Sequence, residues 1–400
     1  MMRILFVLDK YGLFGTPNSG ASNRNTLFVK ALTKLGHVDV CSFSNEAIVS
    51  DIEDCDIVYS NTNYVFSEKG NKYIRGLLSL IQMTLSPLNP NAYYRPRREM
   101  ECIIDELVRK NDYDIIACRY ISTAIRCGLL KYYSKLVLDI DDNPANSIKT
   151  IATSLNSFPL KVKCLYTSKH IARMIENVLN SVFCSFYSNV LEPPSKQSVF
   201  LHNTTVCVAD VPGISCLTPN RLLLVGALSY PPNKYGCYHF VNKIFPLIKQ
   251  RVPDVELQII GKGDNEMLEG LNKLEIKAPG FVEDIVAEYK KARVVVIPIY
   301  QGSGTCVKFV EALFMKRPIV STPVGARGFD IIAKDNEHYL LAKSDAEFAD
   351  KTTDLLLSVS KSNELAKRGY ELAQKWFSND RFISIVEETI KVKFLNKTNQ

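Results

Sequence analysis

The chain has 400 residues, 46% of them hydrophobic, so it can bury a large core, and its length suits about two domains of roughly 100–200 residues each. Its formal net charge of +7, from 49 basic and 42 acidic residues, is too small an excess for a typical nucleic-acid-binding protein and favours anionic small molecules or anionic lipid as partners. The first apolar stretch is too short for a signal peptide, and no run approaches the ~20 apolar residues that cross a bilayer. The 11 cysteines are scattered singly along the chain. We therefore expect a cytoplasmic protein with neither a disulfide framework nor a zinc site.

The N-terminal half alternates short β-branched runs with segments of helical periodicity, which is typical of a parallel sheet covered by helices. After the first strand, apolar spacing predicts a helix over residues 27–35, with Gly36 as its stop signal. The strands predicted in this half are residues 3–8, 38–43, 56–60, 114–117, 136–139 and 182–187. We assign residues 1–205 to a first Rossmann-like domain.

Residues 206–220 contain proline and glycine with little periodicity and predict an interdomain linker. A second series of strands and helices then predicts a second Rossmann-like domain over residues 221–378. Its predicted strands are residues 221–225, 257–260, 294–298 and 319–322, and its predicted helices include residues 238–251 and 285–292. Amphipathic segments over residues 364–376 and 381–393 follow this sheet, and we expect residues 379–400 to form a helix that crosses back to the first domain.

Residues 294–328 read as strand, glycine-bearing loop, helix, strand and loop. In open α/β sheets, ligands bind outside the carboxyl ends of the strands, where helix N-termini direct backbone N–H groups at anions. The loop at this position consists of Gly302, Ser303, Gly304 and Thr305. With Thr305 as the predicted N-cap, Lys308 falls in the first helical turn, where the helix dipole disfavours a cation unless an anion is bound.

Glu311 follows Lys308 by three residues and lies one turn further along the same helix face. Lys308 and the loop amides would neutralise a diphosphate leaving group, and Glu311 would accept hydrogen bonds from ribose hydroxyls. The alternative is an intrahelical Lys–Glu ion pair on a solvated face, worth only ~0.3–0.5 kcal/mol. Spacing alone leaves both interpretations open.

The passage resembles the donor site of retaining glycosyltransferases with the two-domain GT-B fold, specifically glycosyltransferase family 4, in a branch with the signature G-x-G-[ST]-x-x-K-x-x-E-A. The matching residues are Gly302, Gly304, Thr305, Lys308, Glu311 and Ala312. The resemblance extends over residues 222–236, 253–263 and 280–284, and it implies that the backbone of Val282 contacts the nucleobase.

The resemblance implies two Rossmann-like domains facing each other across a cleft, with the acceptor bound by residues 1–205 and the nucleotide sugar by residues 221–378. It also implies transfer of a hexose from a nucleotide-diphosphate sugar, most simply a UDP or GDP sugar, with retention at the anomeric carbon and without a cofactor or a metal. The residues that it assigns to donor binding are Gly20, Val282, Gly302, Ser303, Gly304, Thr305, Lys308 and Glu311, with Lys308 and Glu311 as the catalytic pair.

The chain departs from the family pattern at three positions of the donor site. Many members have a first glutamate where this chain has Ser303, and an arginine and a lysine where this chain has Ala227 and Pro232. Half of the usual phosphate clamp is therefore missing. Lys308 would bear more of the charge, with Lys234 or Arg327 as substitutes.

In the first domain, residues 13–24 resemble the glycine-bearing loop that follows the family's first strand, which assigns Gly20 to the donor and Arg24 to the acceptor side. Arg119 lies near the position where the family often has a histidine, so no general base is assigned. Three carboxylates, Asp139, Asp141 and Asp142, end another strand. We expect caps and turn formers there, with Asp142 near the acceptor, rather than a metal site.

Residues 69–98 combine an apolar helical stripe with aromatic and basic residues, which is typical of a membrane interface, although the stripe also suits a helix packed on the first sheet. We hypothesise contact with the inner face of an anionic membrane and a lipid-linked or surface-glycan acceptor. Two other functions remain open: a nucleotide-sugar 2-epimerase, which shares the fold, and a non-catalytic sugar-nucleotide-binding subunit.

Overall fold

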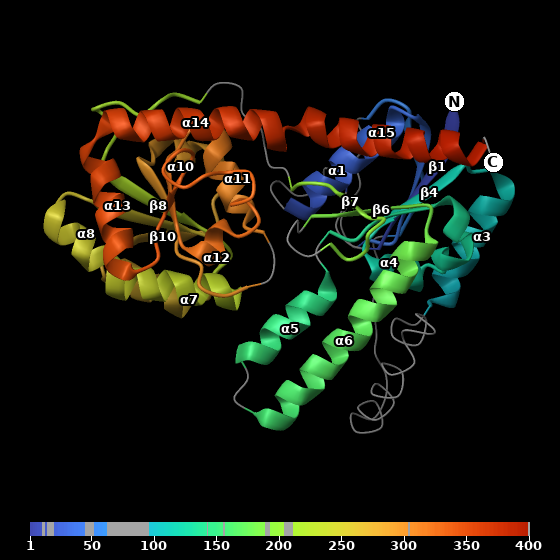
Figure 1. Ribbon diagram of the computed structural model, residues 1–400, viewed down its shortest axis with the longest axis horizontal. Helices are drawn as coiled ribbons and strands as arrows, with labels where there is room; N and C mark the ends of the chain where they lie inside the picture. Colours follow the sequence, from blue (N-terminus) through green and yellow to red (C-terminus); the bar gives the residue numbers. More distant parts are fainter. Residues whose placement is uncertain are drawn as a thin grey trace. The chain divides into compact units, whose positions relative to one another are not determined.

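The computed structural model describes residues 1–9, 13, 20–44, 52–61, 96–141, 143–154, 157–188, 193–203, 211–302 and 305–398 (Figure 1). The chain forms two compact units, unit 1 from Met1–His202 with Asn379–Gln400 and unit 2 from Asn203–Ser378. Most of the predicted interfacial segment 69–98 lies outside the described residues. Among the helices that are described, none is both long and apolar enough to span a bilayer.

Unit 1 is built on a parallel sheet with the strand order β3-β2-β1-β4-β5-β6-β7. Its strands are β1 (Met2–Leu8), β2 (Gly36–Ser42), β3 (Cys55–Ser60), β4 (Ile115–Arg119), β5 (Leu136–Asp139), β6 (Cys184–Tyr187) and β7 (Val199–Phe200). Its helices are α1 (Gly20–Thr33), α3 (Arg98–Lys110), α4 (Ile121–Arg126), η2 (Leu129–Lys135), α5 (Pro144–Ser154), α6 (Phe158–Ser181) and α15 (Asn379–Thr398).

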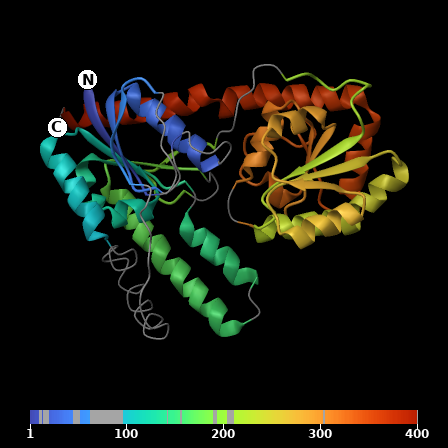
Figure 2. The same ribbon diagram turned by 180° about the vertical axis from the view of Figure 1, so that it is seen from behind.

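Alternate residues of β1 enter two different cores, because successive side chains of a strand point to opposite faces. Ile4 and Phe6 pack with the apolar residues of α1 and α15, whereas Leu5 and Val7 pack with those of α3, α4 and α6. Figures 1 and 2 show α1 and α15 together on one face of this sheet. Both faces are therefore covered, as the near-continuous apolar runs of the strands require.

The helix predicted over residues 27–35 begins earlier, at Gly20, and ends at Thr33. Gly36 does not stop it but is the first residue of β2. A Cβ on Gly36 would lie 1.9 Å from the carbonyl oxygen of Met2, so the close approach of β2 to β1 admits only glycine there. The prediction of Gly36 as a stop signal was wrong because the glycine serves strand pairing.

Unit 2 is built on a second parallel sheet with the order β10-β9-β8-β11-β12-β13. Its strands are β8 (Arg221–Val225), β9 (Glu256–Ile260), β10 (Lys277–Gly280), β11 (Val294–Ile297), β12 (Ile319–Ser321) and β13 (Leu340–Leu341). Its helices are α7 (Pro231–His239), η3 (Phe240–Ile244), α8 (Phe245–Arg251), α9 (Asn265–Lys273), α10 (Ile285–Lys291), α11 (Val307–Phe314), α12 (Pro323–Ala326), α13 (Asp345–Leu357) and α14 (Val359–Phe377).

The sheet of unit 2 also separates two cores. Leu222 and Leu224 pack with residues of η3, α8, α9 and α13, whereas Leu223 packs with residues of α10, α11 and α14. The helix predicted over residues 238–251 is divided into the end of α7, η3 and α8. Pro246 in the first turn of α8 explains the division, because proline has no N–H to donate to the preceding turn.

Each described cysteine is a free thiol. Five of them are buried, and burial raises the pKa of the thiols of Cys41, Cys118, Cys127, Cys184 and Cys237. A raised pKa leaves little reactive thiolate, so these side chains act as small apolar residues of the cores.

Candidate functional site

The strand order of unit 2 creates a switch point between β8 and β11. The chain moves outward from β8 through β9 to β10 and then returns to place β11 on the other side of β8. In such sheets the loops after the two neighbouring strands diverge and leave a crevice where ligands bind. The residues that follow β8 and β11 therefore form the candidate ligand-binding region of unit 2.

The backbones after β8 and β9 approach each other closely at two glycines. The N–H of Gly226 donates to the carbonyl oxygen of Ile260 at 2.8 Å, and a Cβ on Gly261 would lie 1.9 Å from the carbonyl oxygen of Gly226. Gly226 is also close to two side chains, since its Cβ would lie 2.8 Å from Lys308 Nζ and from Asn233 Nδ2. The absence of side chains at this edge leaves room for the lysine.

Lys308 lies in the first turn of α11, and its Nζ donates to Asn233 Oδ1 at 2.8 Å. Asn233 is fixed in turn, because its Nδ2 donates to the carbonyl oxygen of Ala227 at 2.9 Å. Burial lowers the pKa of Lys308, and the neighbouring Cys306 and Glu311 offset only part of that effect. The ammonium group is thus held at the switch point by a neutral amide, which leaves its charge available to an anion.

Glu311 has a different partner. The hydroxyl of Tyr289 on α10 donates to Glu311 Oε2 at 2.9 Å. Tyr289 is fully buried, and burial followed by the charge of Glu311 raises the pKa of its hydroxyl well above the usual value. In the described part of the chain no ion pair joins Lys308 to Glu311, so the intrahelical ion pair considered from the sequence does not form.

The loop before α11 differs from its prediction at Thr305. The helix begins at Val307, its N-cap is Cys306, and no side chain of the described residues caps it. Thr305 lies before the cap, and its Oγ1 instead accepts a hydrogen bond from Asn203 Nδ2 at 3.0 Å. The prediction of Thr305 as N-cap was wrong because this hydroxyl bonds a residue distant in sequence. The N–H of Phe309 donates to the carbonyl oxygen of Cys306 at 2.8 Å, and no described side chain caps the first N–H groups of α11, the end of a helix that attracts an anion.

The other predicted residues of the donor site have partners of their own where the structure describes them. Gly302 accepts a hydrogen bond on its carbonyl oxygen from Arg327 Nη2 at 2.7 Å, and Ser303 and Gly304 lie outside the described residues. Val282 follows β10 and is partly buried against the core beneath α10 and α11. Lys234 forms an exposed ion pair with Asp264 at 3.0 Å.

Unit 1 has the same kind of switch point, between β1 and β4, and it is filled by an ion-pair network. Arg24 on α1 donates from Nε and Nη2 to the two carboxylate oxygens of Asp139, at 2.7 and 2.9 Å. Arg119 at the end of β4 donates to Asp139 at 2.9 Å and to Asp141 at 2.7 Å. Asp142 lies outside the described residues, and Gly20 is the first residue of α1.

The network is buried and charge-balanced. Arg24, Arg119 and Asp139 are each at most 2% exposed. Burial alone would raise the pKa of Asp139, but the two guanidinium groups outweigh it and hold that pKa below the ordinary value. Removing one member of such a network would leave an unpaired buried charge.

Comparison with known proteins now bears on both units. Residues 219–358 match the family described as Glycosyl transferases group 1. Sucrose-phosphate synthase from Thermosynechococcus elongatus superposes with a TM-score of 0.65 at 14% identity, over 99% of this chain and 100% of that one. HepE from Anabaena, solved in complex with UDP and glucose, gives a TM-score of 0.61 at 14% identity, over 98% of this chain and 100% of that one.

The fold is GT-B. A sequence relative, an uncharacterized 44.6 kDa protein in the cps region of Klebsiella pneumoniae, is 22% identical over 311 residues, which cover 71% of this chain and 75% of that protein. The GT-B fold and the group 1 match together support sugar transfer, and the segment matched in unit 2 includes Lys308, Glu311 and the loop between β11 and α11.

The structure adds a feature that the sequence did not suggest. The carboxyl ends of β11, β12 and β13 border a pocket of about 150 Å³ whose lining includes Tyr300, Thr322 and Asp345. His239 Nε2, at the end of α7, lies 2.8 Å from Asp345 Oδ1. Burial, then the charge of Asp345, raises the pKa of Tyr300. In this GT-B unit the pocket borders the residues that follow β11, so it is a candidate for part of the substrate surface.

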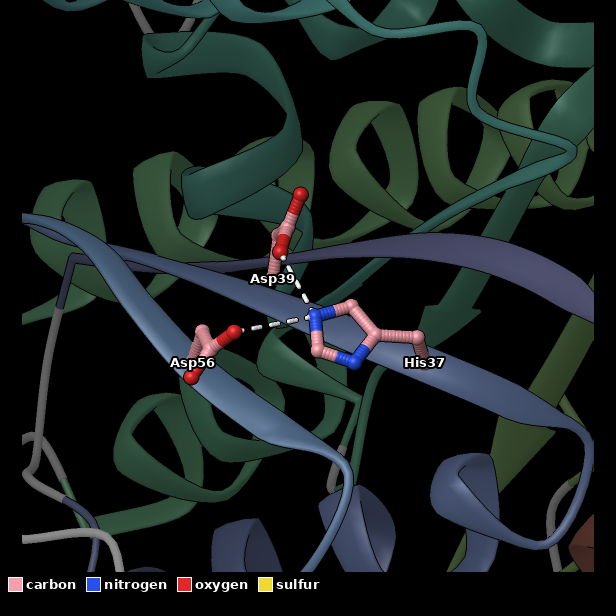
Figure 3. A group of neighbouring side chains, drawn as sticks. All are labelled: His37, Asp39 and Asp56. Carbon is pink, nitrogen blue, oxygen red and sulfur yellow. Dashed lines mark hydrogen bonds and ion pairs between the residues drawn. The ribbon is translucent and has the colours of Figure 1, made fainter.

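A histidine and two carboxylates meet elsewhere in unit 1. His37 Nε2 lies 3.2 Å from Asp39 Oδ1 and 3.3 Å from Asp56 Oδ2 (Figure 3). Asp39 also accepts hydrogen bonds from Tyr113 at 2.6 Å and from Arg3 at 3.4 Å. The cluster lies at the amino ends of β2 and β3, the edge of the GT-B sheet opposite the ligand-binding edge, and its donors already compensate Asp39. We assign it to fixing β3 on the sheet.

Proposed function

We propose that the protein transfers a hexose from a nucleotide-diphosphate sugar, a UDP or GDP sugar, to a glycan or lipid-linked acceptor, with retention of anomeric configuration. In that reaction the bond from C1 of the sugar to the diphosphate oxygen breaks, a bond from C1 to an acceptor oxygen forms, and the acceptor loses a proton. Negative charge develops on the departing diphosphate, so catalysis needs a fixed positive charge beside it.

The observation that carries the proposal is the setting of Lys308. Its ammonium group lies at the switch point of unit 2 with a neutral amide as its hydrogen-bond partner, and burial lowers its pKa. A bound diphosphate would supply the missing negative charge and would also meet the uncapped N-terminus of α11. Glu311, oriented by Tyr289, would accept hydrogen bonds from the ribose hydroxyls.

The remaining assignments follow from this placement of the diphosphate. Gly302, Ser303, Gly304 and Thr305 would bind it, Val282 would contact the nucleobase through its backbone, and Gly20 would also contact the donor. No cofactor or metal takes part. The group 1 match supports the donor site as a whole, and HepE, solved with UDP and glucose, supports the choice of donor class.

On the acceptor side, Arg24 and Arg119 would act as positioning residues. Their guanidinium groups bind Asp139 and Asp141, so they would hold the loops after β4 and β5 in place rather than bind the acceptor themselves. Asp142, which lies outside the described residues, is the residue that we propose to contact the acceptor. We propose that the acceptor is presented at an anionic membrane on its cytoplasmic side.

The test is to replace Lys308 and measure binding of UDP and GDP by calorimetry, together with slow hydrolysis of UDP and GDP sugars. Lys308→Ala removes a charged hydrogen bond worth about 1.5–3 kcal/mol, so we expect roughly 10–150-fold weaker binding and at least as large a loss of hydrolysis. Lys308→Arg should retain part of both. Lys273→Ala, an exposed lysine at the end of α9, is the matched control and should behave as the wild type.

Unchanged binding and hydrolysis in a folded Lys308→Ala protein would exclude this donor site. Incubation of the wild type with donor alone separates the other functions: a new epimer would indicate a 2-epimerase, and binding with neither hydrolysis nor transfer would indicate a non-catalytic subunit. The anomeric configuration of a transferred sugar, read by NMR, decides between retention and inversion.

A further inference from the structure

The first turns of α6 carry apolar side chains on the face that points away from the protein. Phe158 is 76% exposed, Val162 49% and Leu165 43%. At about 100° per residue these three lie within about 60° of one another around the helix axis. Three residues by which α6 enters the core of unit 1, Ile171, Met174 and Val178, lie on the opposite side of the helix at the same spacing.

The described residues of unit 1 leave this stripe exposed. Figures 1 and 2 show α5 and α6 side by side, with their connected ends extending away from the sheet. Helix α5 packs on α6 and still leaves the stripe exposed. Exposure of three large apolar side chains to water is unfavourable, and covering them with another apolar surface would be favourable.

The charges around the stripe indicate what covers it. Residues 143–175 contain no aspartate or glutamate, and their basic residues are Lys149, Lys161, Lys163, Lys169 and Arg173. The three lysines of the first turns, Lys161, Lys163 and Lys169, are all exposed. A second copy meeting the same face would bring like charges together, whereas an anionic lipid surface offers both phosphate groups and an apolar layer.

We propose that the tip of α6, residues 158–169, docks on a bilayer that contains anionic phospholipid. Phe158, Val162 and Leu165 enter the boundary between headgroups and acyl chains, and Lys161, Lys163 and Lys169 bind lipid phosphates. This surface acts whether or not the protein transfers sugar. If it does, docking brings unit 1 to an acceptor that is anchored in the membrane.

The test is sedimentation of the full-length protein with vesicles of phosphatidylcholine alone or of phosphatidylcholine mixed with phosphatidylglycerol. We expect binding only to the mixed vesicles. The variant K161Q/K163Q/K169Q should bind on the order of 100-fold more weakly, since each lysine near an anionic surface contributes about fivefold to affinity. The variant F158S/V162S/L165S should lose at least tenfold at a salt concentration that screens the lysines.

Each variant has a matched control with the same chemical change at exposed positions away from the α6 tip. K273Q/K334Q/K367Q removes three exposed lysines, and L217S/L357S/V392S removes three exposed apolar side chains. Both controls should bind mixed vesicles as the wild type does. Thermal melting and UDP binding of all variants should also match the wild type, which separates failure of this proposal from failure of the proposed function.

A direct readout comes from moving the chain's single tryptophan, Trp376, to the tip. In F158W/W376F, emission should shift to shorter wavelength when mixed vesicles are added, and it should not shift with phosphatidylcholine alone. The proposal is overturned by equal binding to both vesicle types, by no binding to either, or by binding that persists in both α6 variants. The proposal would also be overturned if the wild type formed dimers in solution and the F158S/V162S/L165S variant did not, because a second copy would then cover the stripe.

Discussion

The surroundings of Lys308 disfavour its charged form, as is expected for a residue that binds an anionic ligand. Lys308 lies at a helix N-terminus and is partly removed from water, and its hydrogen-bond partner is an amide rather than a carboxylate. Each of these conditions disfavours an ammonium ion, and burial lowers its pKa accordingly. A bound diphosphate would bring negative charge to this ammonium group and to the helix N-terminus, and both attractions would contribute to donor binding.

The position of Lys308 depends on the glycine beneath it, and Gly226→Ala tests this. The added Cβ would lie 2.8 Å from Lys308 Nζ and from Asn233 Nδ2, at a backbone φ of +157° that other residues adopt only with strain. We expect a loss of about 1–3 kcal/mol in the free energy of unfolding and a displaced ammonium group. Binding of UDP, measured by calorimetry at a temperature where the variant stays folded, should weaken at least tenfold.

The matched control is Gly270→Ala on α9, where a Cβ meets nothing within 4 Å. Alanine is the better helix former there, so this variant should keep its donor affinity and gain up to about 1 kcal/mol in stability. Equal UDP affinity in the two variants would contradict the role given to Gly226.

The helix that carries Lys308 and Glu311 could be predicted from the sequence, but the hydrogen-bond partners of these two residues could not. The motif fixes residues within one loop and one helix, where spacing is informative. Asn233 and Tyr289 reach the site from α7 and α10, and the His239–Asp345 pair joins α7 to α13. No local pattern encodes such contacts, because they depend on how the helices pack on the sheet.

Among the elements, α15 shows how a segment distant in sequence completes a core. Its Phe382, Val386 and Ile390 are fully buried with residues of α1 and the sheet of unit 1. The ring of Phe382 lies 5.3 Å from the guanidinium carbon of Arg24, so the same helix also covers the ion-pair network at the switch point. Stability and the geometry of the unit 1 loops are linked through this helix.

The substitution Phe382→Ala should therefore destabilise unit 1 although the residue lies near the C-terminus. Removing a fully buried phenylalanine typically costs about 3–5 kcal/mol. Urea unfolding followed by far-UV circular dichroism should show an earlier first transition, while Trp376 fluorescence, which reports unit 2, should change little. Val392→Ala on the same helix, 56% exposed, is the control and should leave both signals unchanged.

The strands of both sheets could be predicted largely because buried parallel strands are continuous apolar runs, as in β1 and β11. Three strands were not predicted: β7 and β13 have two residues each, too few to produce a pattern, and β10 has a proline and a glycine among its four residues. The predicted helix boundaries were wrong where one residue had two possible structural roles. Gly36 looked like a helix stop but opens β2, and Thr305 looked like a cap but bonds Asn203.

For the whole molecule, two units with separate cores imply two unfolding transitions that respond to different ligands. The proposed diphosphate site lies in unit 2, so UDP should raise the temperature of the transition seen by Trp376 fluorescence. At a UDP concentration of about 100 times Kd the gain is about 2.7 kcal/mol, which corresponds to roughly 5–11 °C for a unit of this size. The transition of unit 1, followed by circular dichroism, should shift less.

The same melting experiment with Lys308→Ala provides the control, since the shift should largely disappear without the lysine. A UDP-dependent shift confined to unit 1 would show that the nucleotide binds there instead.

The assignment of residues 379–398 to unit 1 has a consequence for how the protein is made. During synthesis, the ribosome completes all of unit 2 before α15 emerges, so unit 2 can fold while the apolar face of α1 and β1 is still uncovered. Until α15 is synthesised, the N-terminal part of unit 1 keeps an exposed apolar face that can bind chaperones or aggregate. A circular permutant that begins with α15 would shorten this exposure, and deletion of the final twenty residues would make it permanent.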